Sequence, residues 1–426
     1  NGLSIDGSGD FVTLAISECK NNKIKIKNRT YFPNSLGIFY HAMTQFLGFN
    51  NYGDEYKVMG LAAYGKPNYF DKIRDNLFKD NKNFLFELNL TYFNHYKNDF
   101  KYIAGDNLVV DKIYSPKLLK LFSNELHNTE NRDQFTRDFA SSVQKIYEFF
   151  FKKIIKHVIS KEFSNNLVFS GGCALNSTAN QVLTTDKELF EKVYIPYAPG
   201  DNGGALGAAF EVASKYKNKI TNSKSPYQGR EFSNDEVIMI LENSLYKNKV
   251  SYKFIPDNKL FKLTSKLISE GNVIGWFQGK MEFGPRALGN RSIIADPRNP
   301  EMKSIINMKI KRRESFRPFA PSVLEEYQAE WFDSDFNNPY MSSLSKVRKD
   351  KQKLIPAVTH VDGTARLQTV SKDSNFVFSK LLSEFYLLTG VPILLNTSFN
   401  ENEPIVMRPE ESLNCLLRTD MDAVFI

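Results

Sequence analysis

The chain has 426 residues, 42% of them hydrophobic and 13% aromatic, which suits two or three packed domains and excludes an intrinsically disordered protein. Against 56 Lys and Arg stand 48 Asp and Glu, and the resulting charge of +8 is too mild at this length to imply polyanion binding. The three cysteines are isolated and no apolar run approaches the roughly 20 residues of a membrane span, so we expect a reducing, cytoplasmic setting without disulfides, cysteine zinc sites or membrane contact.

The first half of the chain predicts alternating strands and helices, which favours an α/β fold. A polar, Asn/Lys-rich segment at 68–131 interrupts this pattern, and we interpret it as an insertion with short helices. Ser35 is expected to cap the first helix. The predicted strands are Leu3–Ile5, Phe11–Ser17, Lys23–Phe32, Leu167–Ser170 and Glu191–Ile195, and the predicted helices are Ser35–Leu47, Asp133–Ser160 and Ser177–Leu183, with a further helix after PGDNGG.

A polar, turn-rich stretch at Asn218–Arg230 marks a domain boundary, which we place between residues 222 and 223. The alternation then resumes. The predicted elements are a helix at Asp257–Glu270, a strand at Val273–Phe277, a helix at Ser374–Leu388 and a strand at Val391–Leu395, followed by NTSFN as a loop.

Three glycine-bearing turns follow predicted strand ends in the first domain. In SIDGSGD, Asp6 can hold a metal ion or phosphate-bound magnesium, although Asp-Gly turns also occur in plain hairpins. In SGGCALN, Gly171 and Gly172 offer backbone N–H groups to a nucleotide and Asn176 can bind a base, but a tight strand–helix turn explains them equally well. In PGDNGGALGAA, Asp201 lies where open α/β sheets bind ligands, while the glycines alone could permit close helix packing.

The stretch from Gly275 to Val323 is rich in Arg and Lys interleaved with Gly and Pro. Guanidinium forks held by rigid turns suit phosphates and carboxylates, because each fork matches two oxygens. A basic surface or an RNA-binding patch is the alternative. Since stacking aromatics are absent over most of the stretch, we favour a small anionic ligand.

Three further blocks have both a structural and a functional reading. EYKVMGLAAYGKP places Glu55 and Lys57 ahead of a short apolar helix, which a charged N-terminus on a packed helix explains. HVDGTARLQTV and LLNTSFNENEPIV are polar segments beside apolar strands. In the latter, Asn396 and Ser398 either contact a ligand or satisfy a turn.

Taken together and in this order, these blocks resemble the O-carbamoyltransferases of the nodulation and antibiotic-tailoring type, over nearly the whole chain from Ser4 onward. GKMEFGPRALGNRSI, KRRESFRPFAPSV, HVDGTARLQTV and NTSFNENEPIV are together specific, while SGGCALN and APGDNGGALGAA are also similar to the universal tRNA threonylcarbamoyl-transfer proteins. The resemblance implies an actin/hexokinase-like (ASKHA) carbamoyl-transfer domain, N-terminally incomplete, at 1–222. A twisted α/β, YrdC-like, carbamoyl-adenylate-forming domain would follow at 223–426.

The resemblance also implies the reaction and its cofactors. The second domain would join carbamoyl phosphate to ATP, giving carbamoyl-adenylate and pyrophosphate. The first domain would pass the carbamoyl group to a hydroxyl with the help of a divalent metal, Fe, Mg or Mn. We expect the acceptor to be a small molecule or a glycan and expect no nucleic-acid partner, with homodimer formation left open. The residues do not identify a general base for the hydroxyl.

Site residues are carried over by position from this resemblance. Asp6 and Asp201 match metal ligands and, with Arg286 and Arg317, would be catalytic. Nucleotide, carbamoyl phosphate or their phosphates would be bound by Gly171, Gly172, Asn176, Lys280, Arg286, Arg291, Lys309, Arg313, Arg317, Asn396 and Ser398.

One feature of the family pattern is missing from the sequence. The family's metal site also uses two histidines of an HxxxH motif upstream of the SIDGSGD turn, and none of the 5 histidines here is spaced that way. We therefore expect an N-terminal part beyond the given start; without it, the transfer site would be inactive or would borrow residues from another chain. The alternatives are a tRNA threonylcarbamoyl-transfer-like enzyme and a non-catalytic nucleotide- or RNA-binding relative.

Overall fold

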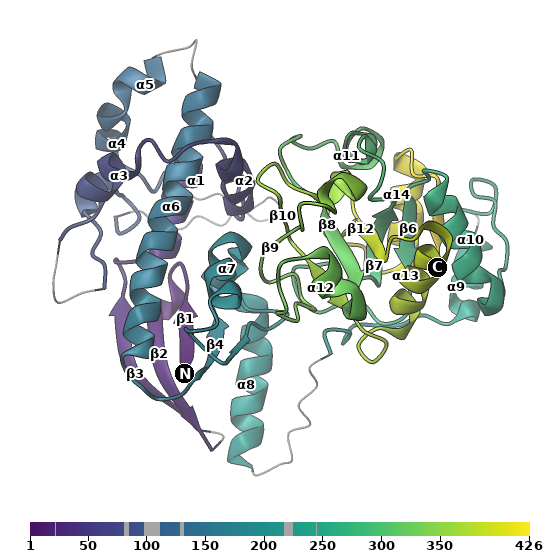
Figure 1. Ribbon diagram of the computed structural model, residues 1–426, viewed down its shortest axis with the longest axis horizontal. Coiled ribbons are helices and arrows are strands. Elements are labelled where there is room, and N and C mark those ends of the chain that lie inside the picture. Colours follow the sequence, from purple (N-terminus) through teal and green to yellow (C-terminus); the bar gives the residue numbers. More distant parts are fainter. Residues whose placement is uncertain (22, 81–84, 98–110, 128–131, 217–224, 244) are drawn as a thin grey trace. The chain divides into compact units, whose positions relative to one another are not determined.

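The computed structural model describes residues 1–21, 23–80, 85–97, 111–127, 132–216, 225–243 and 245–426. The chain divides into two compact units, Asn1–Lys219 and Ile220–Ile426, called unit 1 and unit 2 below (Figure 1). Each unit combines helices with a mixed sheet, which confirms the α/β class expected from the sequence. Among the described residues, no helix is both long and apolar enough to cross a membrane.

The sheet of unit 1 has five strands in the order β3-β2-β1-β4-β5. β1 lies in the middle, antiparallel to β2 and parallel to β4, and β4 is parallel to β5. The carboxyl ends of β1, β4 and β5 therefore lie at one edge, where the three glycine-bearing turns begin. The strands are β1 (Gly2–Ile5), β2 (Val12–Lys20), β3 (Lys23–Tyr31), β4 (Asn166–Ser170) and β5 (Lys192–Tyr194), close to the predicted runs.

Side chains cap α1, α4 and α7 in unit 1. The Ser35 hydroxyl accepts the N–H of Ile38 and caps α1, as predicted. The long helix α6 packs against the sheet through Phe151, whose ring lies 5.3 Å from that of Phe169 in β4. The helices are α1 (Leu36–Phe46), α2 (Glu55–Leu61), α3 (Phe70–Leu77), α4 (Pro116–Leu121), α5 (Ser123–His127), α6 (Arg132–Ile159), α7 (Ser177–Thr185) and α8 (Asp201–Lys215).

The segment 68–131 contains the short helices α3, α4 and α5, but its described residues also contribute to the core of unit 1. Phe78 stacks on Phe150 of α6 with ring centroids 4.2 Å apart. Leu88, Phe93 and Phe122 are fully buried. Its polar composition conceals these anchors, because they are spaced too irregularly to give a helix or strand period.

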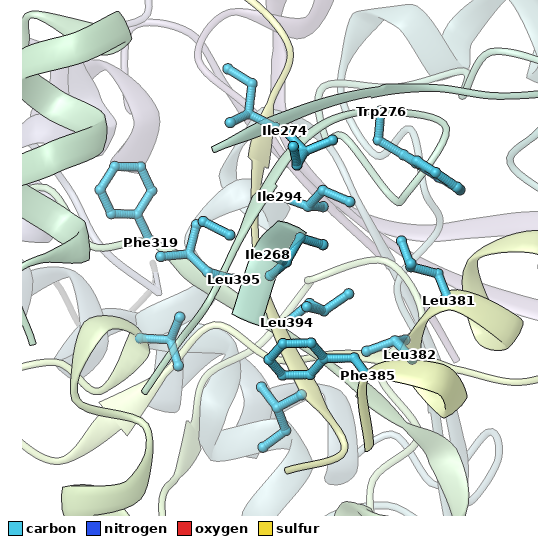
Figure 2. Close-up of a cluster of buried hydrophobic side chains, with 14 of the residues drawn as sticks. Ile268, Ile274, Trp276, Ile294, Phe319, Leu381, Leu382, Phe385, Leu394 and Leu395 are labelled. Carbon is cyan, nitrogen blue, oxygen red and sulfur yellow. The ribbon is translucent and has the colours of Figure 1, made fainter. Parts of the chain in front are cut away.

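The sheet of unit 2 has six strands in the order β11-β8-β12-β7-β6-β13, and β9 and β10 form a separate pair. Figure 2 shows its core, in which Ile268 and Phe385 from two helices face Ile294 and Leu394 from the sheet. The strands are β6 (Ile274–Phe277), β7 (Arg291–Ala295), β8 (Ala320–Leu324), β9 (Ser345–Lys346), β10 (Thr364–Ala365), β11 (Gln368–Val370), β12 (Ile393–Ser398) and β13 (Ala423–Phe425).

Helices cover the sheet of unit 2, and the predicted helices at 257–270 and 374–388 are confirmed within a few residues. A π-helical turn, η6, extends α11 through the basic stretch. The elements are α9 (Asn234–Leu241), α10 (Asp257–Ser269), α11 (Met302–Ile306), η6 (Asn307–Lys311), α12 (Gln328–Trp331), α13 (Phe376–Thr389) and α14 (Pro409–Arg418).

Two segments differ from the sequence-based expectation. The stretch 275–323 contains the buried strands β7 and β8 and is not a succession of turns alone. The NTSFN motif was expected to be a loop, but its first residues, Asn396–Ser398, continue strand β12. All three residues pair with β7, and Asn396 also pairs with β8, so the sheet satisfies backbone groups of this polar segment.

Candidate functional site

Four arginines converge in unit 2. Burial holds the pKa of Arg366 well below its usual range, and the charges of Arg286, Arg313 and Arg317 lower it further. The Nε atom of Arg366 is buried without a hydrogen-bond partner among the described residues. Such a concentration of positive charge is unfavourable alone and is relieved by a polyanionic ligand. Arg286, Arg313 and Arg317, predicted from the sequence, thus lie together.

Arg366 is a residue that we did not select from the sequence. It belongs to the HVDGTARLQTV block, which was interpreted as a polar segment beside a strand and as part of the family resemblance, with no residue of it selected. The signal was present in the same block, because a single arginine stands between a glycine turn and the buried strand β11.

A buried carboxylate shapes the loop that carries Arg286. Oε1 of Glu282 accepts the backbone N–H groups of Leu288 at 2.7 Å and Asn290 at 2.8 Å, and lies 3.3 Å from that of Arg291. Burial raises the pKa of Glu282, and these N–H groups oppose the rise. The loop 282–291 is therefore closed around its own acidic side chain, which fixes the backbone on either side of Arg286.

Arg291 is fully buried and directs its guanidinium at main-chain carbonyl groups. Nη1 donates to the carbonyls of Gln278 and Asn290, and Nη2 to those of Arg230 and Gly279, at 2.8–3.2 Å. The group also lies over the Phe277 ring, 3.6 Å from its centroid. These contacts tie the loop to strand β6 and make Arg291 a positioning residue in this arrangement.

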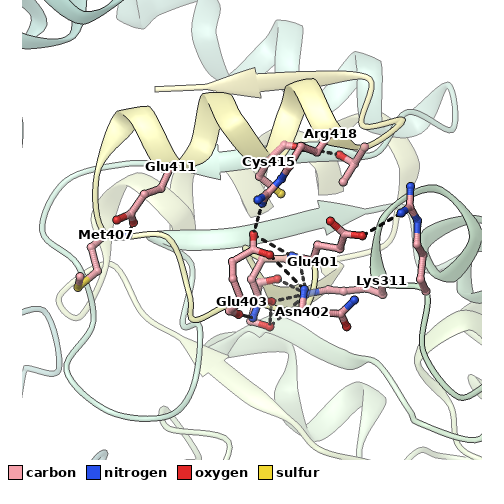
Figure 3. A network of polar contacts seen from close by, with 12 residues as sticks. Lys311, Glu401, Asn402, Glu403, Met407, Glu411, Cys415 and Arg418 are labelled. Atoms are coloured by element: carbon pink, nitrogen blue, oxygen red, sulfur yellow. Dashed lines mark hydrogen bonds and ion pairs between the residues drawn. The ribbon is translucent and has the colours of Figure 1, made fainter. Parts of the chain in front are cut away.

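Lys311 reaches into the turn that follows β12 (Figure 3). Its Nζ lies 2.5 Å from the carbonyl oxygen of Ser398, 2.7 Å from that of Asn400 and 2.6 Å from the Asn400 side-chain oxygen. Burial lowers the pKa of Lys311 well below its usual range, with Arg313 contributing. Lys311 therefore joins the arginine-rich stretch to the predicted ligand residue Ser398.

Asn396 lies two residues before Ser398 on strand β12 and is almost fully buried. Its Nδ2 donates to Ser322 Oγ and to Gln368 Oε1, both at 3.0 Å, and approaches the carbonyl of Ala287 at 3.4 Å. Its Oδ1 is buried without a partner among the described residues. Asn396 thus connects β12 to the residue that follows Arg286.

Two predicted ligand residues lie apart from these contacts. Lys309 forms an ion pair with Asp422 at 2.7 Å. Lys280 is exposed, and its carbonyl accepts a hydrogen bond from Asn290. Their proposed roles in binding ATP or carbamoyl phosphate stay predictions.

In unit 1, the turns after β1 and β4 meet at Asp6. The N–H of Gly7 donates to Asp6 Oδ1 at 2.7 Å, and the N–H of Gly172 donates to Oδ2 at 2.9 Å. A side chain at Gly171, whose φ is +91°, would meet the Ile5 carbonyl at 2.1 Å, so the close approach requires glycine. The predicted residues Asp6, Gly171 and Gly172 are therefore adjacent.

Asp201 begins α8 beside the same turn, because a Cβ on Gly200 would lie 3.8 Å from Gly172 Cα. Burial raises the pKa of Tyr52, and the charges of Asp201, Glu55 and Asp6 add to the rise, so all three carboxylates act on one tyrosine. The described residues include no group of three or more His, Cys, Asp or Glu side chains arranged to hold a metal. Asp6 and Asp201 can nevertheless supply two hard oxygen ligands to an ion that completes its shell with water or phosphate.

Asn176 has structural partners in this arrangement. Its Oδ1 accepts the N–H of Ala179 and caps α7, and its amide exchanges hydrogen bonds with Gln144 of α6. Contact with adenosine stays a prediction for this residue.

Comparison with known proteins matches both units. A family model described as Carbamoyltransferase N-terminus matches residues 1–210, and one described as Carbamoyltransferase C-terminus matches residues 265–426. Nodulation protein NolO of Bradyrhizobium diazoefficiens is 37% identical over 434 residues, covering 100% of this chain and 74% of the relative. An uncharacterized protein of Synechocystis sp. is 38% identical over 448 residues, which cover 99% of this chain and 70% of the relative. Nodulation protein NolNO of Sinorhizobium fredii is 35% identical, covering 100% of this chain and 59% of the relative.

Proposed function

Because the chain belongs to the carbamoyltransferase family, we propose that it is an ATP-dependent O-carbamoyltransferase that makes carbamoyl-adenylate in unit 2 and uses it in unit 1. The observation that carries this proposal is the convergence of Arg286, Arg313, Arg317 and Arg366. ATP and carbamoyl phosphate bring many negative charges into one site, and arginines neutralise such charge in the ground state and on the departing phosphates.

The adenylation step needs carbamoyl phosphate, ATP and water. Water attacks the carbamoyl carbon as the bond from that carbon to the phosphate oxygen breaks, which gives carbamate and phosphate with loss of the water protons. A carbamate oxygen then attacks the α-phosphorus of ATP, and the bond from that phosphorus to the pyrophosphate oxygen breaks. Arg286 and Arg366 are suited to the two anionic substrates, since each is flanked by further positive charge. Lys311 and Asn396 hold β12 against the arginine-bearing segments, which supports a fixed geometry for in-line attack.

Transfer is assigned to unit 1. We propose that Asp6 and Asp201 bind a divalent ion, whose chemistry when bound would be to polarise the carbamoyl carbonyl. The N–H groups of Gly7 and Gly172 hold both oxygens of Asp6 in place and leave each a second lone pair. We assign adenosine binding to the turn at Gly171 and Gly172, and the acceptor is a hydroxyl of a small molecule or a sugar.

The same proposal extends to the folds of the two units. The order β3-β2-β1-β4-β5, with parallel β1, β4 and β5, supports an actin/hexokinase-like unit 1. The mixed six-stranded sheet supports a YrdC-like unit 2.

The direct test supplies the protein with ATP and carbamoyl phosphate and follows pyrophosphate release and carbamoyl-adenylate by mass spectrometry. We expect both products from the wild-type protein and neither from Arg286→Ala. Arg348→Ala is the matched control, because Arg348 is an exposed arginine of the same unit. Pyrophosphate release that does not depend on carbamoyl phosphate, or that survives Arg286→Ala, would contradict the assignment.

A further inference from the structure

A histidine–glutamate pair lies in unit 1 outside the residues assigned so far. Nδ1 of His41, on α1, is 2.5 Å from Oε1 of Glu55, the first residue of α2. His41 is 7% exposed and its Nε2 is buried without a partner among the described residues. Glu55 keeps 34% of its side chain exposed, so one end of the pair is buried and the other is accessible.

The pair is anchored to the Asp6 turn. Ser35, the cap of α1, donates its hydroxyl to the Asp6 carbonyl at 3.0 Å. Helix α1 then packs so closely on the turn after Asp6 that a Cβ on Gly37 would lie 2.8 Å from Gly7 Cα. His41 follows one helical turn later, which holds the imidazole, and with it Glu55, at a fixed offset from Asp6.

The charges of Glu55 and Asp6 act on the same two side chains, those of Tyr52 and Cys173. The charge of Glu55 acts on Tyr52 together with those of Asp6 and Asp201. It also acts, with that of Asp6, on Cys173 in the turn after β4. The three carboxylates still do not form a metal-holding group among the described residues. Through His41 and helix α1, Glu55 is linked to the turn that carries Asp6.

From this geometry we infer that Glu55 is the general base that takes the proton from the acceptor hydroxyl, and that His41 is a positioning residue that orients it. The inference rests on the proposed carbamoyl transfer in unit 1 and supplies the base that the sequence did not identify. With a proton on Nδ1, His41 donates to Oε1, which leaves Oε2 of Glu55 to accept the hydroxyl proton.

The step balances as follows. The acceptor O–H bond breaks, its proton passes to Glu55, and the oxygen forms a bond to the carbamoyl carbon. The bond from that carbon to the phosphate oxygen of AMP breaks, and its electron pair leaves with AMP. The products are the carbamate ester, AMP and a proton, which Glu55 releases to solvent.

Other side chains nearby are less suited to this role. Both oxygens of Asp6 accept backbone N–H groups. Burial raises the pKa of the Cys173 thiol to about 12, so it stays protonated. The accessible surface of the His41 ring does not include Nε2. Glu55 combines partial exposure with a dedicated orienting partner.

The test compares two hydroxyl probes, water and the more acidic 2,2,2-trifluoroethanol, as acceptors for carbamoyl-adenylate formed in situ, with AMP release as the readout. A general base matters more for the less acidic hydroxyl. Glu55→Gln should therefore slow the water reaction roughly 10²- to 10⁴-fold and the trifluoroethanol reaction less. Glu55→Asp should restore part of the loss. Pyrophosphate release and Mn²⁺ affinity should not change.

Glu211→Gln is the matched control, because Glu211 is an exposed carboxylate of α8 in the same unit, paired with Lys215. The inference would be overturned if Glu55→Gln slowed AMP release equally with both probes or did not slow it at all. Weakened Mn²⁺ binding in Glu55→Gln would also overturn it. A wild-type protein that forms the adenylate but does not accelerate its reaction with either probe would overturn it too. Absence of adenylate formation would instead refute the proposed function, and the inference would fall with it.

His41 is tested separately as a positioning residue. His41→Asn keeps a side-chain N–H near the place of Nδ1, whereas His41→Leu removes it. We expect His41→Leu to lower kcat for AMP release with little change in KM. It should also slow AMP release with water more than AMP release with trifluoroethanol, as Glu55→Gln does. His41→Asn should recover most of the wild-type behaviour; equal effects of the two variants would refute an orienting hydrogen bond.

Discussion

The main-chain N–H of Gly172 donates to Oδ2 of Asp6 across 2.9 Å, joining the ends of two parallel strands of unit 1. The N–H of Gly7 occupies the other carboxylate oxygen at 2.7 Å. Asp6 therefore has a structural role, since it accepts hydrogen bonds from both turns, and it also presents its remaining lone pairs to the site. A substitution that keeps one of these roles can still remove the other.

Asp6→Asn should destabilise unit 1 as well as stop transfer. An amide has one acceptor oxygen, so its NH₂ group would face one of the two backbone N–H donors. We expect a loss of about 1–3 kcal/mol in the free energy of unfolding, measured by urea denaturation. Asp10→Asn, at an exposed position of the same turn, is the control. Unchanged stability of Asp6→Asn would show that these hydrogen bonds contribute little.

Arg366→Met should abolish adenylation without unfolding unit 2. The substitution removes one of four clustered positive charges, so the free protein is relieved of repulsion while the phosphates lose a partner. Pyrophosphate release should fall roughly 10²- to 10³-fold, and the thermal midpoint should stay the same or rise. A thermal midpoint that falls steeply would mean that Arg366 is needed for folding, against the assignment.

In contrast to Arg366→Met, Arg291→Met should lower the stability of unit 2 more than it lowers the binding of ATP. It removes the guanidinium of a fully buried side chain, which donates to four main-chain carbonyls. The carbonyls of Asn290 and Arg230 keep a main-chain donor, while those of Gln278 and Gly279 lose the guanidinium bond. We expect a loss of about 2–4 kcal/mol in the free energy of unfolding by denaturant titration. Arg348→Met, at an exposed arginine, should be neutral. If Arg291→Met folds as stably as the wild type and only binds ATP less well, Arg291 is a ligand residue.

Asp362 gives a pH-dependent prediction for the loop before Arg366. Burial acts to raise the pKa of Asp362, but hydrogen bonds from His360 and Thr364 outweigh it and hold the pKa at about 2, below the ordinary 3.8. A carboxyl whose pKa is lowered by folding stabilises the fold above its unfolded pKa and loses that contribution as the pH falls through the folded value.

Asp362→Asn should therefore lower the stability of unit 2 at neutral pH, by an amount that shrinks as the pH is taken down to roughly 3 and below. Urea titrations of the two proteins over this range measure the difference. Asp350→Asn, at an exposed position, should show no such trend. If the free energies of unfolding of Asp362→Asn and wild type differ by the same amount at every pH, the ionised carboxylate is not the source of the difference.

The sequence was most informative where glycine follows an apolar run. The strands before Asp6 and Gly171, and the Ser35 cap, could all be predicted because each depends on local rules of turn and cap chemistry. Asp6 and Gly172 were each placed after a strand, whereas the parallel pairing that brings these two strand ends together was not predicted.

Tertiary partners could not be read in this way. Arg291 and Arg286 stand five residues apart in one basic block, yet one faces main-chain carbonyls and the other faces further arginines. Glu55 looked like an ordinary helix N-terminus, because its partner His41 is on another helix and no local pattern connects them. Arg366 was missed because its neighbours Arg286 and Arg317 come from distant parts of the chain.

The central claim is that one chain carries out two separable half-reactions, and Asp201→Ala tests it most directly. The experiment supplies ATP, carbamoyl phosphate and a hydroxyl probe, and follows pyrophosphate release and AMP release side by side. The account predicts wild-type pyrophosphate release in Asp201→Ala with transfer-linked AMP release abolished, and loss of both in Arg286→Ala. Normal AMP release from Asp201→Ala, or pyrophosphate release that fails together with it, would contradict the account.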